Sequence, residues 1–420
     1  MLAGHRYAAL LSFEGPDRYS AVGGLGTRVT SFARALGERE LDVQLFFVGD
    51  PGLPDVEEFA PGVTLRRWSQ WISAYHPRGV YDGEEGKVND FRESVPRFVA
   101  TDIVAVAASE GAKVLVVAEE WQTADAVIRL DAILRAAGLR GNATLLWNAN
   151  NTYGFERIDW GALQRAAAIT TVSRYMKFEL AVRGIASLVV PNGIDEALLD
   201  GPRQSTIETL RAALRGRPAL LKVGRFDPDK NWLQAIDAVA ELKAWGGAPQ
   251  LIVRGGREPY GEVVFDRARR RGLSVERIEA DGDDTAAVAA ALAGATGDVV
   301  HLIAFLPEPT LNALYVAADA VLANSGKEPF GLVGLEVMAS GGLAVCGSTG
   351  EDYAEPFVNA LVCDGEDGRE LAEYLRVIDG DAVRAEQMRQ AGFATAHRYV
   401  WPNVLDTLAF KLGFVARMVR

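Results

Sequence analysis

Short apolar runs alternate with helix-like stretches along the first half of the chain, and no other feature of the sequence constrains the fold so strongly. The apolar runs cover residues 8–13, 43–48, 113–118, 144–147 and 168–172, and the helix-like stretches cover 27–36, 124–137 and 174–182. Such alternation predicts βα units, in which each helix returns the chain so that successive strands lie parallel. We therefore expect an α/β fold built on a parallel sheet.

The pattern breaks near the middle of the chain and then starts again. An apolar run at 188–190 leads into the turn-rich segment 191–195 and a polar stretch at 200–205. Strand-like runs then resume at 219–223, 251–253, 299–303, 320–323 and 343–345, with helix-like stretches at 232–244, 311–317, after Gly331 and at 383–398. Because 420 residues are too many for one ordinary core, we expect two Rossmann-like domains, residues 1–195 and 196–400, joined by a hinge near 191–195.

The last segment, residues 401–420, carries one further helical pattern. Trp401 and Pro402 interrupt the chain after the preceding helix, and apolar residues at helical spacing run from about 404 to 418. We expect a final helix that begins after the proline and crosses back to the first domain.

Composition and charge exclude several classes of protein. Hydrophobic residues make up 49% of the chain and charged residues 24%, which is typical of a globular α/β protein, and the net charge of −12 argues against a nucleic-acid or anionic-membrane surface. No apolar run suits a signal peptide or reaches the ~18 residues of a membrane span, so we expect a cytoplasmic protein. Cys346, Cys363 and four scattered histidines lack metal-ligand spacing, and the acidic residues from 276 to 284 are expected to form a solvated loop.

Two glutamates, Glu328 and Glu336, flank a predicted helix start. Apolar helical spacing begins after Gly331, so the backbone amides of Gly331, Leu332 and Val333 are expected to face an anion. Glu336, about one turn along the helix, can accept from both hydroxyls of a ribose, and Glu328, on the loop, can reach a hexose ring. The alternative is that both are ordinary acidic residues that complement the helix dipole.

Two cations, Arg225 and Lys230, follow the strand-like run at 219–223. Ligands of open α/β sheets bind at the carboxyl ends of strands, so this pair is placed to stabilise a departing diphosphate. Arginine can hold two oxygens, whereas lysine acts as a point charge. The alternative is a surface pairing with Asp227 and Asp229.

Two polar loops of the first half complete the candidate residues. Gly23 and Gly24 lie between the first strand and its helix, where backbone amides can approach a phosphate, unless the loop is merely flexible. Asn150, Asn151 and Tyr153 follow the run at 144–147, where amides and an aromatic ring suit sugar hydroxyls and ring faces. We expect this second loop to line the acceptor side, the alternative being a turn-rich loop with packing aromatics.

Together these segments resemble the retaining GT-B glycosyltransferases of the family that includes glycogen synthases, sucrose-phosphate synthases and mannosyltransferases, the glycosyltransferase family 4 type. The resemblance covers nearly the whole chain. It rests on the segments 328–336, 224–230, 190–195, 170–177 and 23–26. It implies the GT-B fold: two Rossmann-like domains that face a central cleft, with a C-terminal helix crossing back to the N-terminal domain.

The resemblance also implies roles for single residues. Arg225 and Lys230 are expected to bind the diphosphate of the sugar donor, Glu336 its ribose and Glu328 the transferred sugar. The amides of 331–333 are expected to support phosphate and sugar, Leu306 to lie against the base, and Gly23 and Gly24 to contact the diphosphate or sugar from the opposite domain.

The sequence departs from this family at one strand end. Glu119 stands where the family commonly has a histidine near the transferred sugar. Glu119 and Glu120 thereby become candidates for contacts with the acceptor or the sugar, Glu119 among the catalytic residues. The alternative is a carboxylate that only faces the cleft.

The implied activity is retaining transfer of a hexose, with glucose expected, from a nucleoside-diphosphate sugar to a soluble acceptor. UDP-glucose is favoured because such glycine-glycine loops occur in glucosyl-transferring relatives, while ADP-glucose and GDP-mannose stay open. No Asp-x-Asp follows a strand, so we expect no metal and no obligatory cofactor. We expect no nucleic acid and no integral membrane contact among the partners.

Two alternatives to glycosyl transfer remain at this point. A nucleotide-sugar epimerase of the same architecture would also bind a nucleoside diphosphate, but few histidines are available for proton transfer. A non-catalytic sugar-nucleotide-binding protein is conceivable because Glu119 departs from the family.

Overall fold

The computed structural model describes residues 4–214 and 216–418, which form two compact units. The first unit comprises Met1–Gly193 together with Trp401–Arg420, and the second comprises Ile194–Val400. Residues 1–3 of the expected first domain, residue 215 of the second, and residues 419–420 of the expected terminal helix lie outside the described residues.

The described residues of the first unit form an eight-stranded sheet, ordered β3-β4-β2-β1-β5-β6-β7-β8. Neighbouring strands run parallel except β3 and β4, which a short turn joins as an antiparallel pair at the edge. The strands are β1 (His5–Leu11), β2 (Asp42–Val48), β3 (Val56–Ala60), β4 (Val63–Trp68), β5 (Lys113–Glu119), β6 (Ala143–Ala149), β7 (Ala168–Thr171) and β8 (Leu188–Val189).

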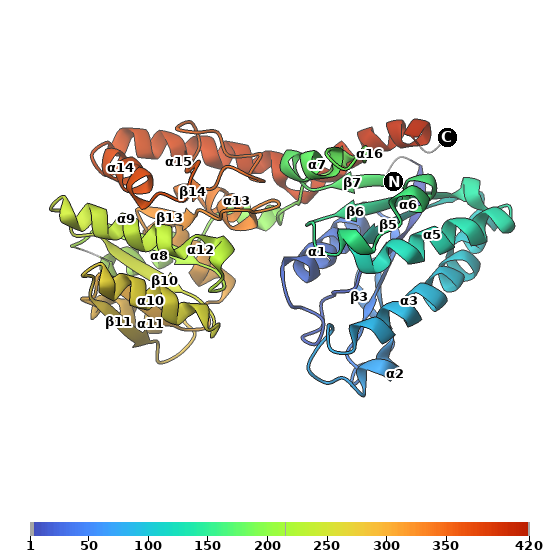
Figure 1. The fold of residues 1–420 in the computed structure, drawn as a ribbon, viewed down its shortest axis with the longest axis horizontal. Coiled ribbons are helices and arrows are strands. Elements are labelled where there is room, and N and C mark those ends of the chain that lie inside the picture. The colour runs from blue at the N-terminus through green and yellow to red at the C-terminus, as the bar shows by residue number, and fades with distance from the viewer. Residues whose placement is uncertain (1–3, 215, 419–420) are drawn as a thin grey trace. The chain divides into compact units, whose positions relative to one another are not determined.

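Helices cover both faces of this sheet (Figure 1). Helix α1 (Gly24–Glu38) and the terminal helix α16 (Trp401–Met418) share an apolar core with the sheet. Helices α3 (Glu84–Phe98), α5 (Trp121–Ala136) and α6 (Trp160–Ala166) form a second layer, in which α5 contacts both others. Shorter helical segments are α2 (Gln70–Ser73), a π-helical segment (Val99–Val104), α4 (Ala105–Ser109) and α7 (Arg174–Ala181).

Helix α16 begins at Trp401, before the proline and not after it as the sequence pattern predicts. Pro402 therefore lies in the first turn, where backbone N–H groups have no intrahelical acceptor and a missing N–H costs nothing. The buried Trp401 ring stacks on Phe32 of α1, with 5.2 Å between the ring centroids. The Trp-Pro pair thus starts the helix and anchors it on the first unit.

The described residues of the second unit form a seven-stranded sheet, ordered β11-β12-β10-β9-β13-β14-β15, in which all neighbours pair in parallel. Its strands are β9 (Ala219–Val223), β10 (Gln250–Arg254), β11 (Val275–Glu279), β12 (Val299–Ile303), β13 (Ala320–Ala323), β14 (Ala344–Cys346) and β15 (Leu361–Val362).

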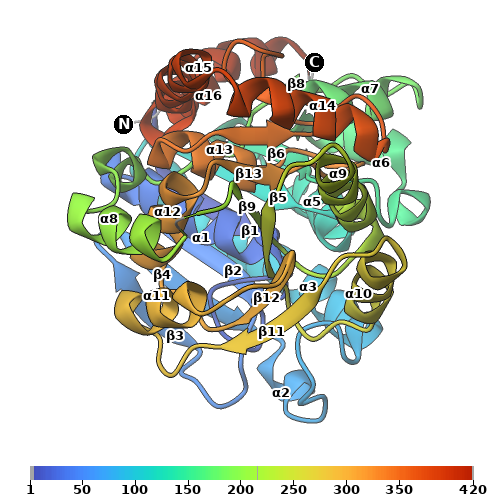
Figure 2. The same cartoon turned by 90° about the vertical axis from the view of Figure 1, so that its left-hand side faces the viewer.

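Two groups of helices flank this second sheet, as Figure 2 shows. One group is α9 (Trp232–Ala244), α10 (Tyr260–Arg270) and α14 (Gly368–Asp379). The other is α8 (Gln204–Ala213), α11 (Thr285–Ala293), α12 (Glu308–Ala317) and α13 (Leu332–Ser340), and α15 (Ala382–Ala396) packs on α13 and α14. None of the helices that the structure describes is long and apolar enough to cross a membrane.

Strand β11 corrects one expectation, because Glu276 and Glu279 lie in this strand and not in a solvated loop. The strand is at the edge of the sheet and pairs only with β12, so its charged side chains reach water while its backbone is bonded. Glu276 also accepts from the backbone N–H groups of Thr296 and Gly297, at 2.8 and 2.7 Å. Residues 281–284 do form a loop.

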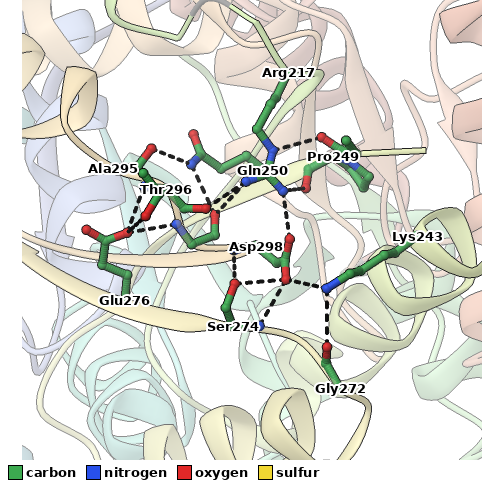
Figure 3. Close-up of polar contacts among 12 residues, drawn as sticks. Arg217, Lys243, Pro249, Gln250, Gly272, Ser274, Glu276, Ala295, Thr296 and Asp298 are labelled. Atoms are coloured by element: carbon green, nitrogen blue, oxygen red, sulfur yellow. Dashed lines mark hydrogen bonds and ion pairs between the residues drawn. The ribbon is translucent and has the colours of Figure 1, made fainter. Parts of the chain in front are cut away.

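Asp298 joins the amino-terminal ends of three strands of the second sheet (Figure 3). Its carboxylate accepts from Arg217 before β9 and Lys243 of α9, each at 2.7 Å, and from the hydroxyl and backbone N–H of Ser274 before β11, each at 2.9 Å. Burial raises the pKa of Asp298, but the hydrogen bonds from Lys243, Ser274 and Arg217 outweigh it and hold that pKa well below its usual range. An ionised carboxylate therefore fastens this edge, opposite the carboxyl ends of the strands.

Replacing Asp298 by alanine should destabilise the protein by about 2 kcal/mol, because partly buried cations lose their partner. Urea unfolding at neutral pH measures this. In the matched control, Asp266→Ala, an exposed pair with Arg269 is lost and the change should stay below about 0.5 kcal/mol.

The stability that Asp298 contributes should also depend on pH. Because the folded pKa lies below the unfolded value of about 3.9, the contribution is present above that value and is lost as the pH falls toward the folded one. Wild-type protein should therefore lose more stability than Asp298→Asn between about pH 4 and pH 2. Equal losses of stability in the two proteins would contradict an ionised Asp298 in the folded state.

Candidate functional site

The carboxyl ends of strands β9 and β13 bring several predicted residues of the second unit together. The two strands are parallel neighbours, so the loops that follow them leave the sheet at the same edge. Gly224 and Arg225 follow β9 directly, and a 3-10 turn (Pro228–Lys230) then presents Lys230. The Lys230 ammonium donates to the carboxylate of Glu328, which lies on the loop after β13. We call this group, together with the start of α13, the β9–β13 site.

The cations of this site are not neutralised by the aspartates beside them. Lys230 pairs with Glu328, and the Asp227 carboxylate instead accepts from the backbone N–H of Asp229 at 2.9 Å. Arg225 is exposed and makes no ion pair within the described part of the chain, while its carbonyl accepts from the Trp232 indole at 2.9 Å. The backbone of Arg225 is thus held in place while its guanidinium stays available to a ligand.

Helix α13 begins without a side-chain cap. Gly331 is the N-cap residue, with a left-handed φ of +74°, and it has no side chain to occupy the amides of Leu332 and Val333. The hydroxyl of the buried Tyr353 donates to the carbonyl of Gly331 and fixes the turn. The helix start therefore leaves these amides without a side-chain cap, which is the arrangement that anion binding needs.

Glu336 lies on the first turns of α13 and is half-buried. Burial, and then the charge of Glu308, raises the pKa of Glu336 to about 7. This carboxylate is costly to keep ionised until hydrogen-bond donors reach it.

Lys222 is a residue of this region that the sequence analysis missed. It is 3% exposed on β9, and its ammonium donates to the side-chain oxygen of Asn324 at 2.6 Å and to the carbonyl of Leu322 at 3.1 Å. Burial, and then the charge of Lys230, lowers the pKa of Lys222 to about 7. Lys222 therefore ties the ends of β9 and β13 together, and the signal for it is a lysine inside an otherwise apolar strand.

The loop after β12 carries the residue expected beside a base. Leu306 is 7% exposed, whereas its neighbour Phe305 is 65% exposed. The apolar surface that this loop offers to a ligand is therefore mainly that of Phe305.

In the first unit, the glycine loop already binds a carboxylate of the protein itself. Glu14, after β1, accepts from the backbone N–H groups of Gly23 at 3.1 Å and Gly26 at 3.2 Å. Its other oxygen accepts from the hydroxyl of Tyr81 at 2.5 Å. Gly24 is exposed at the first position of α1. A phosphate at this helix start must share the loop with Glu14 or displace it.

Glu119, at the end of β5, is the centre of a buried polar cluster. It is 1% exposed and accepts from the Arg28 guanidinium at 3.2 Å and from the amides of Asn148 at 2.8 Å and Asn150 at 2.7 Å. Arg28 also donates to Asn192 in the 191–195 segment. Both oxygens of the Glu119 carboxylate therefore accept hydrogen bonds from the protein itself. The sequence analysis did not find Arg28, which pairs with Glu119.

The remaining first-unit candidates lie around this cluster. Glu120 is buried with a left-handed φ of 68°, accepts from the backbone N–H of Asn150 at 2.7 Å, and has its pKa raised to about 8, chiefly by burial. Asn151 accepts from the backbone N–H of Tyr153 at 2.7 Å, and Tyr153 is 66% exposed. Tyr153 is thus the side chain of this loop most open to a ligand.

Comparison with known proteins gives a family profile for the second unit and relatives that span most of the chain. Residues 211–394 match the sequence profile of the family "Glycosyl transferases group 1". D-inositol 3-phosphate glycosyltransferase 1 of Catenulispora acidiphila is 25% identical, over 92% of this chain and 89% of that protein. Sucrose-phosphate synthase from Thermosynechococcus elongatus has a TM-score of 0.66 at 21% identity, covering 99% of each chain. Anabaena HepE in complex with UDP and glucose has a TM-score of 0.61 at 17% identity, covering 97% of this chain and 99% of its own.

The two parallel-sheet units and these likenesses define a protein of the GT-B fold. Residues 211–394, most of the second unit, thus carry the profile of group 1 glycosyltransferases, and the described chain has the GT-B fold.

Alanine at the two ends of α13 should separate backbone strain from packing in this site. Gly331 and the C-cap residue Gly341 both have left-handed φ angles, so each alanine should cost about 1–2 kcal/mol. At Gly331 the new Cβ would also lie 2.6 Å from Cγ of Glu351, whereas at Gly341 it meets no described atom within 4 Å. Urea unfolding should show that Gly331→Ala loses at least about 1 kcal/mol more than Gly341→Ala. Equal losses would contradict the packing at Gly331.

Proposed function

We propose that the protein is a retaining hexosyltransferase that takes its sugar from a nucleoside-diphosphate sugar and needs no metal. The observation that carries this proposal is the β9–β13 site, where Arg225, Lys230, Glu328 and the uncapped start of α13 share one sheet edge. The likeness to HepE, whose structure contains UDP and glucose, supports UDP-glucose as the first sugar donor to test.

In this proposal each group of the site meets one part of the sugar donor. Arg225 and Lys230 bind the diphosphate, aided by the amides of Gly331, Leu332 and Val333. Glu336 accepts from the ribose hydroxyls, and Glu328 contacts the transferred hexose. The base lies against the loop of Leu306, and the exposed ring of Phe305 extends this contact by stacking.

In the free protein, Lys230, the cation proposed to stabilise the leaving group, forms an ion pair. Lys230 is bound to Glu328, and a diphosphate offers the ammonium a doubly charged partner in its place. The exchange frees the Glu328 carboxylate to accept from a sugar hydroxyl. Binding of the sugar donor therefore makes Lys230 available to the diphosphate and Glu328 available to the sugar.

We assign the acceptor to the first unit, at the loop of Asn150, Asn151 and Tyr153 beside Glu120. Glu119 acts there as a positioning residue, because it holds Asn148 and Asn150 while Arg28 neutralises it. Gly23 and Gly24 contact the diphosphate or sugar only where Glu14 leaves the loop free. The acceptor is a soluble molecule with a free hydroxyl group.

The chemistry needs a stabilised leaving group more than a protein nucleophile. The bond between the anomeric carbon and the diphosphate oxygen breaks, the acceptor oxygen bonds to the same carbon on the same face, and the departing phosphate takes the acceptor proton. Arg225, Lys230 and the helix amides offset the charge that develops on the diphosphate. Among the described residues no His, Cys, Asp or Glu cluster is arranged as a metal site.

The test is a panel of UDP, ADP and GDP sugars, with and without chelator, read by thermal stabilisation and by diphosphate release. We expect one sugar donor to stabilise the protein and to release its diphosphate in the presence of chelator. Loss of all activity on chelation would contradict metal independence, and no stabilisation by any member would contradict the site.

Lys230→Ala should lower turnover at least about 100-fold while the protein stays folded, because it removes charge stabilisation of the leaving group. The matched control is Lys113→Ala, an exposed lysine at the amino-terminal end of β5. Near-normal turnover of Lys230→Ala would remove Lys230 from this role.

A further inference from the structure

A buried carboxyl group without a hydrogen-bond partner lies behind the start of α13. Glu351 is 5% exposed, and neither of its carboxyl oxygens makes a hydrogen bond of good geometry to a described residue, although the backbone N–H groups of Thr349 and Glu351 itself lie nearby. Leaving such a group unpaired is costly, so buried polar groups are normally satisfied. A buried carboxyl group without a hydrogen-bond acceptor beside the β9–β13 site suggests that its acceptor is within reach only when that site holds a ligand.

Packing places this carboxyl group against the loop of the β9–β13 site. A Cβ on Gly331 would lie 2.6 Å from Cγ and 2.9 Å from Oε1 of Glu351, so the acid fills the space beside the N-cap residue. The backbone N–H of Glu328 donates to the hydroxyl of Thr349 at 2.9 Å, and Tyr353 donates to the carbonyl of Gly331. The segments 328–331 and 349–353 therefore form one packed pair of loops, which holds both Glu328 and Glu351.

Burial, more than the charges around it, favours the protonated form of Glu351. Burial, and then the charge of Glu328, raises the pKa of Glu351 to about 8, while Lys230 and nearby backbone N–H groups lower it. The other titratable groups that face it are Cys346 at the end of β14 and Tyr353, and the pKa values of both are raised well above their usual range by burial. At neutral pH the Glu351 carboxyl group is therefore mostly a neutral hydrogen-bond donor with no acceptor.

We propose that Glu351 is a positioning residue of the sugar-donor site, which acts as a neutral acid that replaces Lys230 as the hydrogen-bond donor to Glu328 when a diphosphate draws Lys230 away. This inference rests on the proposed function and deepens it. Without the proton, two negative carboxylates on this packed pair of loops would repel each other after the ammonium has left, at a cost that opposes binding. Sugar-nucleotide binding therefore requires the proton on Glu351.

The proposal fixes the direction of the pH dependence. Removing Lys230 from Glu328 and adding an anionic diphosphate both raise the proton affinity of Glu351, so its pKa is higher in the complex than in the free protein. The affinity for the sugar nucleotide is then highest below the pKa of Glu351 in the free protein, which is about 8. Above that pKa, binding takes up a proton from water. Glu336 acts in the opposite direction, because it must be ionised to accept from the ribose and its pKa is raised to about 7.

The experiment is calorimetric titration of the protein from pH 6 to pH 9.5 with the sugar nucleotide selected by the panel. Each pH is measured in two buffers of different ionisation enthalpy, so that proton uptake is obtained directly. The variants are Glu351→Gln, which keeps a neutral hydrogen-bonding group, and the control Glu355→Gln, which removes an exposed carboxylate from the same loop. Urea unfolding of each variant confirms that it folds.

We expect the affinity of the wild type to fall about tenfold per pH unit above pH 8.5, with uptake of between a half and one proton. Glu351→Gln should bind as well as wild type at pH 7 and lose both the fall and the uptake, while Glu355→Gln should behave like wild type. Binding without proton uptake in the wild type, or the same fall in Glu351→Gln, overturns the proposal even if that variant is unstable. Absence of any sugar-nucleotide binding overturns the proposed function itself, and this inference with it.

Discussion

The parallel pairing of β9 with β13 is the constraint on which the candidate site depends. Because the strands run in the same direction, the cationic loop after β9 and the acidic loop after β13 leave the sheet at the same edge. Lys222 reinforces the pairing from inside the sheet, where it donates to Leu322 and Asn324 at the end of β13. Asp298 links the amino-terminal ends of β9, β11 and β12. The residues of the site, at the carboxyl ends of the strands, are not needed for that link.

An ion pair inside the site links its two halves. Lys230 and Glu328 are far apart in sequence, yet each neutralises the other in the free protein. In the proposed complex a diphosphate competes for the lysine, and the released glutamate then needs a new hydrogen-bond donor. The unpaired acid Glu351, packed behind the same loop, is placed to supply it. In this proposal, sugar recognition and leaving-group stabilisation follow from one exchange of partners.

Much of the fold could be predicted from periodicity, because buried parallel strands are short apolar runs between helices. The alternation led to the α/β fold of both units, and the family resemblance to GT-B, which the comparisons confirm. The polar edge strand β11 was missed because its exposed side chains look like those of a loop. The start of α16 was misplaced because a proline that breaks a helix interior is well tolerated in a first turn.

The residues of the candidate site also differ in how well the sequence predicts them. Lys230, Glu328 and Gly331 could be found because each stands in a local motif at a strand or helix end. Lys222, Arg28, Glu14 and Glu351 were missed because their contacts join distant segments. Only Lys222 carries a signal in the sequence, a charge inside an apolar run.

Hydrogen–deuterium exchange with and without the selected sugar nucleotide tests the central claim most directly, because it reports where the ligand sits without relying on turnover. The account predicts added protection in peptides that cover residues 224–231 and 325–336 of the second unit. Protection confined to other segments, with these two unchanged, would contradict the assignment of the sugar-donor site.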